Sequence, residues 1–298
     1  MGNKKYNDLM SRIHLGECIL IDGGTGTECE RRGVPQVTNT WNSGAALSHP
    51  DIVRTVHEEY IECGAEIIIT NTFSSSRHCL RTAGIEHEFE NLTNAACRLA
   101  QEAVNNQNRP DVLIAGGITH WIWTDEWPSI EELEINSRDQ AMLMAEAGCD
   151  LIMLEMLSHI DRLLACIEGS QASGLPVWPG VSVEPKDGEM CLLGGEPLVD
   201  AIHAIKDKNI PLISIMHTEV EYIDQCLDIL DEHWQGPVGV YAHVCRFSED
   251  NTTAYFDDNI SPEDYAVAAR RWKERGVKVI GGCCGVRREH ICELKTTL

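Results

Sequence analysis

Short apolar runs rich in β-branched residues alternate with longer amphipathic stretches along this chain, and the alternation repeats eight times. The runs cover residues 18–24, 66–73, 112–118, 150–157, 177–183, 211–217, 237–243 and 277–284. Helical periodicity fills the intervals, for example over residues 86–106, 130–147, 160–171, 220–233 and 262–275. This order is typical of βα units that surround a parallel sheet.

Glycines mark the ends of the predicted helices. Gly64, Gly148, Gly174 and Gly276 each stand just before a predicted strand, where a helix C-terminus favours glycine. Eight regular units without a break in composition predict one domain over residues 1–298, folded as an α/β protein of the (β/α)8 TIM-barrel type. On the pattern alone, a six-stranded sheet with two misread loops remains the alternative.

Composition limits the partners that this chain can have. The formal net charge of -23 disfavours binding to nucleic acid or to an anionic membrane surface. No apolar run approaches the roughly 20 residues that cross a bilayer, and the N-terminus lacks the apolar segment of a secretory signal. We therefore expect a cytoplasmic protein in a reducing compartment. Most of its 13 cysteines are then expected to be small buried apolar residues, such as Cys18, Cys97, Cys149, Cys166 and Cys226.

Polar residues collect where the predicted strands end. In a TIM barrel the C-terminal strand ends form one face, and that face carries the chemistry. The eight strand ends read Asp22-Gly23-Gly24, Thr70-Asn71-Thr72, Gly116-Gly117, Glu155, Ser182, His217, His243 and Cys283-Cys284. The predicted barrel therefore has a polar mouth suited to a site.

The segment Gly281-Gly282-Cys283-Cys284-Gly285 is the sharpest local signal. Two glycines relax a strand end, so that adjacent side chains, which normally point to opposite faces, can turn toward one site. Two neighbouring thiols suit a soft metal such as zinc, which in a catalytic site takes a third protein ligand and leaves its fourth position open. A pair of packed or redox-active cysteines is the alternative.

Three segments together resemble the homocysteine S-methyltransferase family: DGGTGTECERRG at 22–33, HEEYIECGAEIIITNTF at 57–73 and SPEDYAVAARRWKERGVKVIGGCCG at 261–285. The resemblance runs from about residue 18 to residue 292. It implies a (β/α)8 barrel that binds Zn²⁺ through three ligands, two of them Cys283 and Cys284. The family's third ligand is a cysteine that closes the sixth strand. Here the aligned residue is His217, and we expect its imidazole to replace the thiolate, although a lone histidine on an apolar strand is more often a core residue.

The resemblance also implies where the amino-acid end of the acceptor binds. The corresponding positions are Asp22, Gly23, Thr70 and Glu155. Backbone N–H groups at a glycine turn can bind a carboxylate, and Glu155 can pair with an ammonium group. The alternatives are a turn or helix-capping role for Asp22 and a salt bridge within the barrel for Glu155.

Other positions depart from the family pattern, which indicates a rebuilt substrate pocket. The segments Gly117-Ile118-Thr119-His120 and Tyr241-Ala242-His243 replace family motifs after strands three and seven. Trp41 stands in the first βα loop, and a tryptophan-rich loop follows strand three with Trp121, Trp123 and Trp127. Aromatic rings attract methylated cations, so Trp41 is a candidate for the donor site. The loop could equally be a lid or a subunit contact, and the sequence leaves its role open together with those of His120 and His243.

These observations predict a zinc-dependent methyltransferase. The expected reaction moves a methyl group from a cationic S- or N-methyl donor to a thiol acceptor, homocysteine or a relative, with the metal favouring the thiolate and the barrel aligning the reactants. One alternative is a thiol-binding module that acts with a separate corrinoid methyl carrier. The other is a non-catalytic homologue that binds metal or a small molecule. The sequence leaves open the identity of donor and acceptor and the formation of a homo-oligomer.

Overall fold

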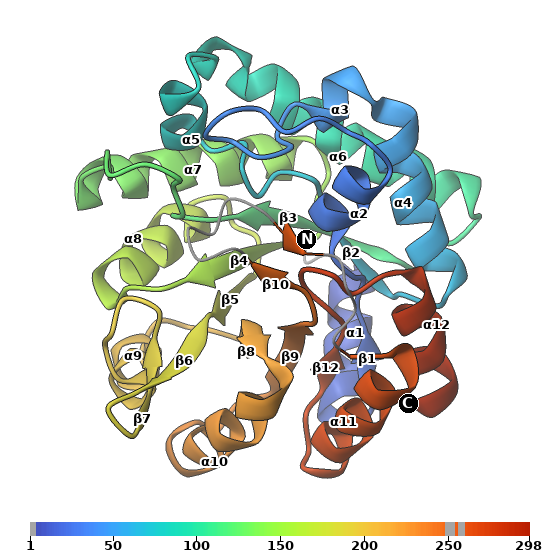
Figure 1. Ribbon diagram of the computed structural model, residues 1–298, viewed down its shortest axis with the longest axis vertical. Coiled ribbons are helices and arrows are strands. Elements are labelled where there is room, and N and C mark those ends of the chain that lie inside the picture. Colours follow the sequence, from blue (N-terminus) through green and yellow to red (C-terminus); the bar gives the residue numbers. More distant parts are fainter. Residues whose placement is uncertain (1–3, 248–253, 256–259) are drawn as a thin grey trace.

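The computed structural model describes residues 4–247, 254–255 and 260–298. Eight parallel strands form one sheet in the order β1-β12-β9-β8-β5-β4-β3-β2, and a bridge from Ile21 to Ile67 joins its two edges. The helices surround this ring of strands (Figure 1). The predicted (β/α)8 barrel is therefore confirmed. Its strands are β1 (Ile19–Leu20), β2 (Ile67–Ile69), β3 (Leu113–Ile118), β4 (Leu151–Leu157), β5 (Val177–Val181), β8 (Ile213–Glu219), β9 (Val238–His243) and β12 (Val279–Ile280).

The helices end where the sequence predicts them to end. Gly64, Gly148, Gly174 and Gly276 all have positive φ, the conformation that terminates a helix without steric cost in glycine. Ser129 and Ser261 cap the starts of α7 and α11 with side-chain hydrogen bonds to Glu132 N and Asp264 N. The main outer helices are α2 (Thr25–Arg31), α4 (Pro50–Glu62), α6 (Phe89–Asn106), α7 (Ile130–Glu146), α8 (Ile160–Gln171), α9 (Leu198–Ile205), α10 (Ile223–His233), α11 (Pro262–Glu274) and α12 (Arg288–Thr297). Shorter elements in the loops are α3 (Ala45–Ser48), α5 (Arg77–Thr82), η1 (Glu86–Glu88) and η2 (Val220–Tyr222).

Alternation along each strand produces two apolar layers. In β4, Leu151 and Met153 point into the barrel, while Ile152 and Leu154 pack outward against helices. Both faces of a parallel barrel strand are covered, so these strands read as continuous apolar runs rather than as alternating ones. This pattern explains why the predicted strands were visible in the sequence.

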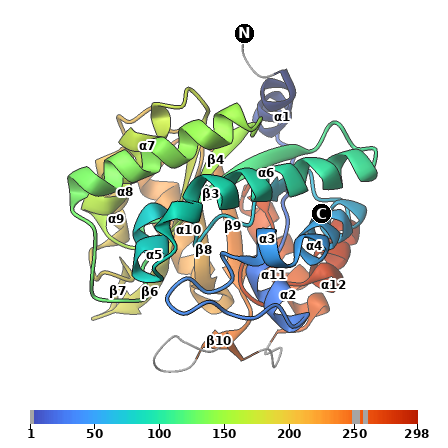
Figure 2. The ribbon, with the colours of Figure 1, turned by 90° about the horizontal axis from the view of Figure 1, so that it is seen from above.

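Helix α1 (Lys4–His14) closes the N-terminal end of the barrel, which we call the barrel floor. Its Tyr6 packs among the inward-facing residues and accepts a hydrogen bond of 3.0 Å from Trp178 Nε1. Lys5 pairs with Asp150, just before β4, at 2.9 Å. Figure 2 shows α1 at one end of the molecule and two hairpins, β6 (Val183–Lys186) with β7 (Glu189–Leu192) and β10 (Arg246–Phe247) with β11 (Ala254–Tyr255), toward the other. Neither α1 nor the two hairpins were predicted from the sequence.

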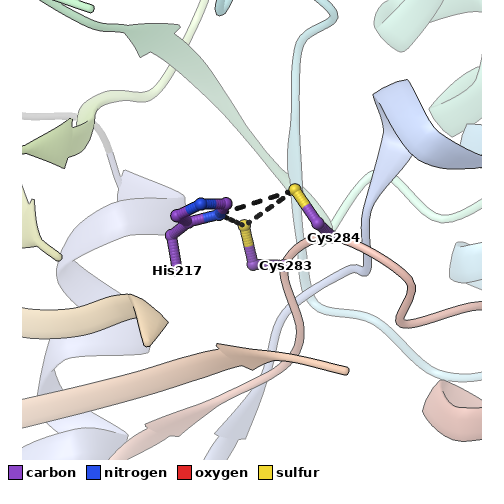
Figure 3. Close-up of side chains that lie close together, drawn as sticks. All are labelled: His217, Cys283 and Cys284. Carbon is purple, nitrogen blue, oxygen red and sulfur yellow. Dashed lines mark hydrogen bonds between the residues drawn. The ribbon is translucent and has the colours of Figure 1, made fainter. Parts of the chain in front are cut away.

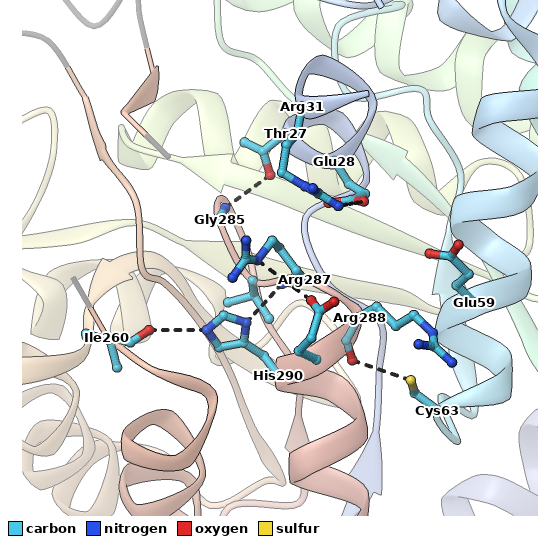
Figure 4. A network of polar contacts seen from close by, with 12 residues as sticks. Thr27, Glu28, Arg31, Glu59, Cys63, Ile260, Gly285, Arg287, Arg288 and His290 are labelled. Carbon is cyan, nitrogen blue, oxygen red and sulfur yellow. Dashed lines mark hydrogen bonds and ion pairs between the residues drawn. The ribbon is translucent and has the colours of Figure 1, made fainter. Parts of the chain in front are cut away.

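One pair of cysteines was not anticipated. Cys63, at the end of α4, forms a disulfide with Cys292 in α12, across 229 residues of chain. Cys63 Sγ also lies 3.4 Å from the Arg288 carbonyl oxygen, in the first turn of α12 (Figure 4). Four of the five cysteines expected in the core are buried, and Cys18 is partly exposed. Among the described residues, no helix is long and apolar enough to cross a membrane.

Candidate active site

A cleft of about 1160 Å³ opens at the C-terminal end of the barrel strands. This is the face where TIM barrels place their active sites. The cleft brings together residues that lie far apart in the sequence. Its lining includes the predicted residues Gly23, Trp41, Thr70, Glu155, His217, Cys283 and Cys284, together with His243, Trp121, Trp123 and Trp127. Asp22 lies next to Gly23 and is 1% exposed.

His217, Cys283 and Cys284 form a compact triangle in this cleft (Figure 3). Nδ1 of His217 is 3.6 Å from each sulfur atom, and the two sulfurs are 3.7 Å apart. Ligands placed tetrahedrally around zinc, with Zn–S of about 2.3 Å and Zn–N of about 2.0–2.1 Å, would stand about 3.7 Å apart for two sulfurs and about 3.5–3.6 Å for sulfur and nitrogen. The spacing and chemistry of these atoms therefore fit a zinc ion.

His217 reaches the triangle because β8 is irregular at this point. Met216 faces the barrel interior, so simple alternation would direct His217 outward. Instead, the register between β8 and β9 shifts after Met216, and His217 has a φ of 45°. A bulge of this kind re-aims a side chain, and such features are common next to active sites.

Positive φ angles occur at two further large residues of the cleft. Met156 (φ 57°) follows Glu155 where β4 shifts register against β5, and Trp41 has a φ of 48°. Among the described residues other than Gly, Asn and Asp, only Trp41, Met156 and His217 have positive φ, and all three line this cleft. Such backbone conformations cost free energy in larger residues and persist where the surroundings enforce them, often at functional sites.

The glycines before the two cysteines are required by close packing. A Cβ atom on Gly281 would lie 2.2 Å from Ile21 Cγ1, and one on Gly282 would lie 2.1 Å from Val286 Cγ1. The chain after the cysteines is held by Gly285 N, which donates to Thr27 Oγ1 at 3.1 Å (Figure 4). The glycine-rich strand end therefore presents both sulfurs on a tightly anchored turn.

The surroundings of His217 and Cys284 shift the pKa values of these two candidate ligands. Desolvation, followed by proximity to His243, lowers the pKa of His217 well below its usual value, so its imidazole is neutral and able to bind a metal. Contacts with the thiols of Cys245 and Cys283, together with burial, raise the pKa of Cys284 well above its usual value. Metal binding would therefore release the proton of the Cys284 thiol. Cys245, which packs beside Cys284, was missed by the sequence analysis because nothing in its local sequence marks it.

The two histidines whose roles were open lie in different places. His243 lines the cleft with its ring centroid 4.8 Å from that of His217, and it contacts the His217 backbone. His120 is fully buried outside the cleft lining, and its Nε2 lies 3.0 Å from Ser158 Oγ. Burial lowers the pKa of both imidazoles. His243 can support His217, whereas His120 supports the packing beneath Trp127.

Three polar groups below the triangle have unused hydrogen-bonding capacity. Asp22 Oδ2 accepts from Ile69 N at 2.7 Å, but Asp22 Oδ1 has no hydrogen-bond partner, and neither has the hydroxyl of Tyr241. Glu155 lines the cleft, and burial raises its pKa to about 8. Desolvation, and then the nearby Glu155, also raises the pKa of Asp22. These groups would gain from a bound cation that donates hydrogen bonds.

Thr70 and the glycines shape this pocket rather than adding charge. Thr70 Oγ1 lies 2.7 Å from Thr72 Oγ1 and accepts from Gly117 N at 3.2 Å. A Cβ on Gly117 would stand 2.6 Å from Glu155 Oε2, and one on Gly23 would stand 2.4 Å from the Val286 carbonyl oxygen. Both glycines are therefore needed to leave space beside the carboxyl group and the turn.

Aromatic rings form one wall of the cleft. Trp41 packs against the cluster of Cys245 and Cys284 and meets Phe73 edge-on at 6.4 Å between ring centroids. Phe73 in turn meets Trp123 edge-on at 6.1 Å. Trp121 and Trp127 extend the wall, and the guanidinium carbon of Arg162 lies 4.6 Å from the Trp127 ring centroid. The tryptophan loop therefore contributes directly to the cleft.

Comparison with known proteins agrees with this architecture. The family model described as homocysteine S-methyltransferase matches residues 19–298. Betaine–homocysteine S-methyltransferase 1 of Danio rerio is 26% identical over 98% of this chain and 75% of its own length. Homocysteine S-methyltransferase YbgG of Bacillus subtilis (strain 168) is 26% identical over 93% of each chain. The metallated form of the homocysteine methyltransferase MmuM from Escherichia coli shares the fold, with a TM-score of 0.78 at 22% identity over 97% of this chain and 99% of that one.

Proposed function

The chain belongs to the homocysteine S-methyltransferase family, and from this we propose that it is a zinc-dependent enzyme that methylates the sulfur of homocysteine or a close relative. The methyl group comes from a cationic S- or N-methyl donor. The observation that carries the proposal is the triangle of His217, Cys283 and Cys284, whose ligand atoms stand 3.6–3.7 Å apart in the cleft at the barrel mouth. A zinc ion bound there would favour the thiolate form of the acceptor at neutral pH.

The residues below the triangle hold the amino-acid end of the acceptor. Glu155 and Asp22 receive its ammonium group, and both carboxyl groups then ionise in the presence of the positive charge. The backbone N–H of Gly23 is the group assigned to the acceptor carboxylate. The next N–H of the turn, that of Gly24, is not available because it already donates to the Val286 carbonyl oxygen. Tyr241 supplies a further donor from the hydroxyl that lacks a partner. These contacts direct the acceptor sulfur toward the two cysteines.

Trp41 places the donor on the other side of the acceptor sulfur. Its indole packs against Cys245 and Cys284, and its Nε1 donates to Glu30 at 3.0 Å. An aromatic face attracts a methylated cation. Alignment of the acceptor sulfur, the methyl carbon and the leaving group is most of what a displacement at carbon requires. The wall and the acceptor pocket together provide this alignment.

Metal analysis and a substrate panel test the proposal. Purified protein is expected to hold about one zinc per chain, and Cys283→Ala is expected to lose most of it, whereas Cys226→Ala, which truncates a buried cysteine in α10, retains it. Sulfonium and quaternary ammonium donors are then combined with homocysteine and other thiols, and methylated products are measured by mass spectrometry. Activity that requires an added methyl-corrinoid would favour the carrier alternative. Tight zinc binding with no transfer from any donor would indicate a non-catalytic protein.

A further inference from the structure

Among the described residues that line the cleft, every charged side chain is acidic. Five acidic residues line it: Glu30, Asp125, Glu155, Glu184 and Glu219. No lysine or arginine occurs among the described lining residues. Burial raises the pKa of Glu155, deep in the cleft, to about 8, so its carboxyl group is mostly protonated in the free protein at neutral pH. Asp125 and Glu184 are exposed and make the outer cleft acidic. This one-sided charge affects any ligand that enters.

The acidic groups act together with an aromatic wall that is fixed in place. Trp41 donates its indole N–H to Glu30, which also accepts from Gln36 Nε2 at 2.8 Å. Gly26 leaves the space for the ring, since a Cβ there would stand 2.5 Å from Trp41 Cη2. The left-handed backbone of Trp41 is therefore held by packing and by a carboxylate hydrogen bond. A negative partner on the indole N–H strengthens the attraction of the ring face for a cation.

From this arrangement we propose that the methyl donor is a sulfonium or quaternary ammonium cation that carries no carboxylate. The inference rests on the proposed function and names the substrate class of the same site. A donor such as betaine brings a carboxylate into a cleft in which every described charged side chain is acidic, and like charges at close range disfavour the complex. A cation whose other substituents are neutral meets no like charge among the described lining side chains. The relative from Danio rerio carries betaine in its name, so the proposal separates this chain from that protein.

The reaction balances without a further reactant. The bond between the methyl carbon and the donor heteroatom breaks, and its electron pair stays on that atom, which becomes a neutral thioether or tertiary amine. The methyl carbon forms a new bond to the acceptor sulfur, whose proton has passed to water. The demethylated donor has lost its positive charge, and with it the attraction to the indole and to the acidic groups. The charge of the cleft therefore favours binding of the donor over binding of its product.

A matched pair of donors tests the proposal. Dimethylsulfoniopropionate and (3-hydroxypropyl)dimethylsulfonium share the reacting sulfonium and differ by a carboxylate in place of a hydroxymethyl group. We expect the hydroxylated donor to have a kcat/KM roughly tenfold or more above that of the carboxylate donor. Its association constant, measured by quenching of tryptophan fluorescence, should be higher by a similar factor. Each exposed charge contact changes an equilibrium by up to about fivefold, and several acidic groups act together. Added salt should reduce the ratio of kcat/KM between the two donors, because it screens the repulsion of the carboxylate. Equal use of the two donors, or preference for the carboxylate, overturns the proposal.

A variant that removes one negative charge tests whether the acidic lining of the cleft causes the selectivity between the two donors. Glu30→Gln keeps an oxygen that can accept from Trp41 and removes one negative charge, so it should reduce the ratio between the two donors by roughly two- to fivefold. Glu90→Gln, on the exposed face of α6, makes the same change in net charge and should leave the ratio unaltered. A ratio that does not change in Glu30→Gln contradicts the proposal. Preferential binding of the hydroxylated donor with no methyl transfer would contradict the proposed enzymatic function and support the donor site. Rapid transfer from the carboxylate donor would support the enzymatic function and contradict the proposed donor class.

Discussion

The two ends of the barrel are built on opposite principles, although the same strands connect them. At the barrel floor, α1 covers the strand starts, Tyr6 bonds to Trp178, and Lys5 pairs with Asp150. At the mouth, the Tyr241 hydroxyl in the cleft lining and Asp22 Oδ1 just behind Gly23 have no hydrogen-bond partner, and the cleft is lined by residues with positive φ. Satisfied polar groups and regular packing stabilise a fold, whereas unsatisfied groups lower stability and are ready for a ligand. The floor therefore serves stability and the mouth serves binding.

Single strands show the same contrast along their length. In β8 the residues from Ile213 to Met216 pair regularly with β9, and the register shifts just where His217 enters the cleft. In β4 the pairing with β5 is regular from Ile152 to Leu154 and shifts beside Glu155 and Met156. The lower part of each strand follows the alternation of a β-strand, and the upper part departs from it to point side chains into the cleft. Substitutions at the two ends should therefore have separable effects.

The largest expected effect is the loss of metal from the mouth. Cys284→Ala should lower zinc affinity by more than roughly a hundredfold. Removing a residue that only hydrogen-bonds to a metal ligand already lowers affinity by up to about a hundredfold, and Cys284 is itself a proposed ligand. His217→Ala should behave similarly, because two sulfurs leave the site one protein ligand short. Zinc content is measured after dialysis against a weak chelator, and circular dichroism checks the fold. Full zinc occupancy in His217→Ala would show that His217 is not a ligand, and His243 would become the candidate for the third ligand.

The second largest effect belongs to the floor. Trp178 is completely buried inside the barrel, and Trp178→Ala should reduce the free energy of unfolding by about 3–5 kcal/mol. Because its contacts lie at the end opposite the cysteines, the protein that remains folded should retain its zinc. Urea denaturation and metal analysis measure the two quantities. Trp41→Ala is the matched variant at the mouth, where we expect weaker donor binding and a smaller loss of stability. If Trp178→Ala emptied the metal site in folded protein, the two ends would not be independent.

The sequence predicted the barrel well because its strands are buried on both faces. Each of the eight predicted runs overlaps an observed strand, and the four glycines mark helix ends as expected. The hairpin at 183–192 was missed, although Asp187-Gly188, both with positive φ, is a typical hairpin turn that could have revealed it. Helix α1 was missed because its role depends on contacts with distant strands. The disulfide between Cys63 and Cys292 has no local signal at a separation of 229 residues.

The candidate site was predictable in composition but not in orientation. The resemblance placed His217, Cys283 and Cys284 together, whereas strand alternation alone would have turned His217 away from Cys283. Its direction depends on the bulge in β8, which is set by tertiary packing rather than by a local motif. The acidic lining was also hidden, because its five acidic residues come from five separate parts of the chain: helix α2, the loop after β3, and strands β4, β6 and β8.

The third prediction concerns the acceptor pocket. If Glu155 binds the acceptor ammonium, Glu155→Gln should weaken acceptor binding by about 1.5–3 kcal/mol, the usual value for a hydrogen bond to a charged group. Donor binding and zinc content should change little. Isothermal titration calorimetry with an ammonium-bearing thiol, and with the same thiol lacking the amino group, separates the contributions. An unchanged preference for the amino thiol in the variant would take Glu155 out of the site.

Glu155 also predicts a pH dependence with a definite sign. Its pKa is raised from 4.5 to about 8 in the folded protein, so at neutral pH the folded protein binds a proton that the unfolded chain has released. The associated stability is fully present below pH 4.5 and is lost as the pH rises through 8. Acceptor binding should instead strengthen as the pH rises toward 8, with release of about one proton at pH 7. Calorimetry in buffers of different ionisation enthalpy measures that release, which should disappear in Glu155→Gln.

The smallest effect should come from removing one oxygen atom at the floor. Tyr6→Phe deletes the hydroxyl that accepts the hydrogen bond from Trp178 Nε1 and leaves that buried N–H without its partner. The aromatic contact with Trp178, at 6.0 Å between ring centroids, is retained. The free energy of unfolding should fall by about 1–3 kcal/mol, the cost of a buried polar group left unsatisfied. At the mouth, Tyr241→Phe removes a buried hydroxyl that has no partner, so the same chemical change should be neutral or stabilising in the free protein and should weaken acceptor binding. Equal destabilisation by the two variants would show that the Tyr241 hydroxyl already has a role in the fold, and the contrast between floor and mouth would fail at this position.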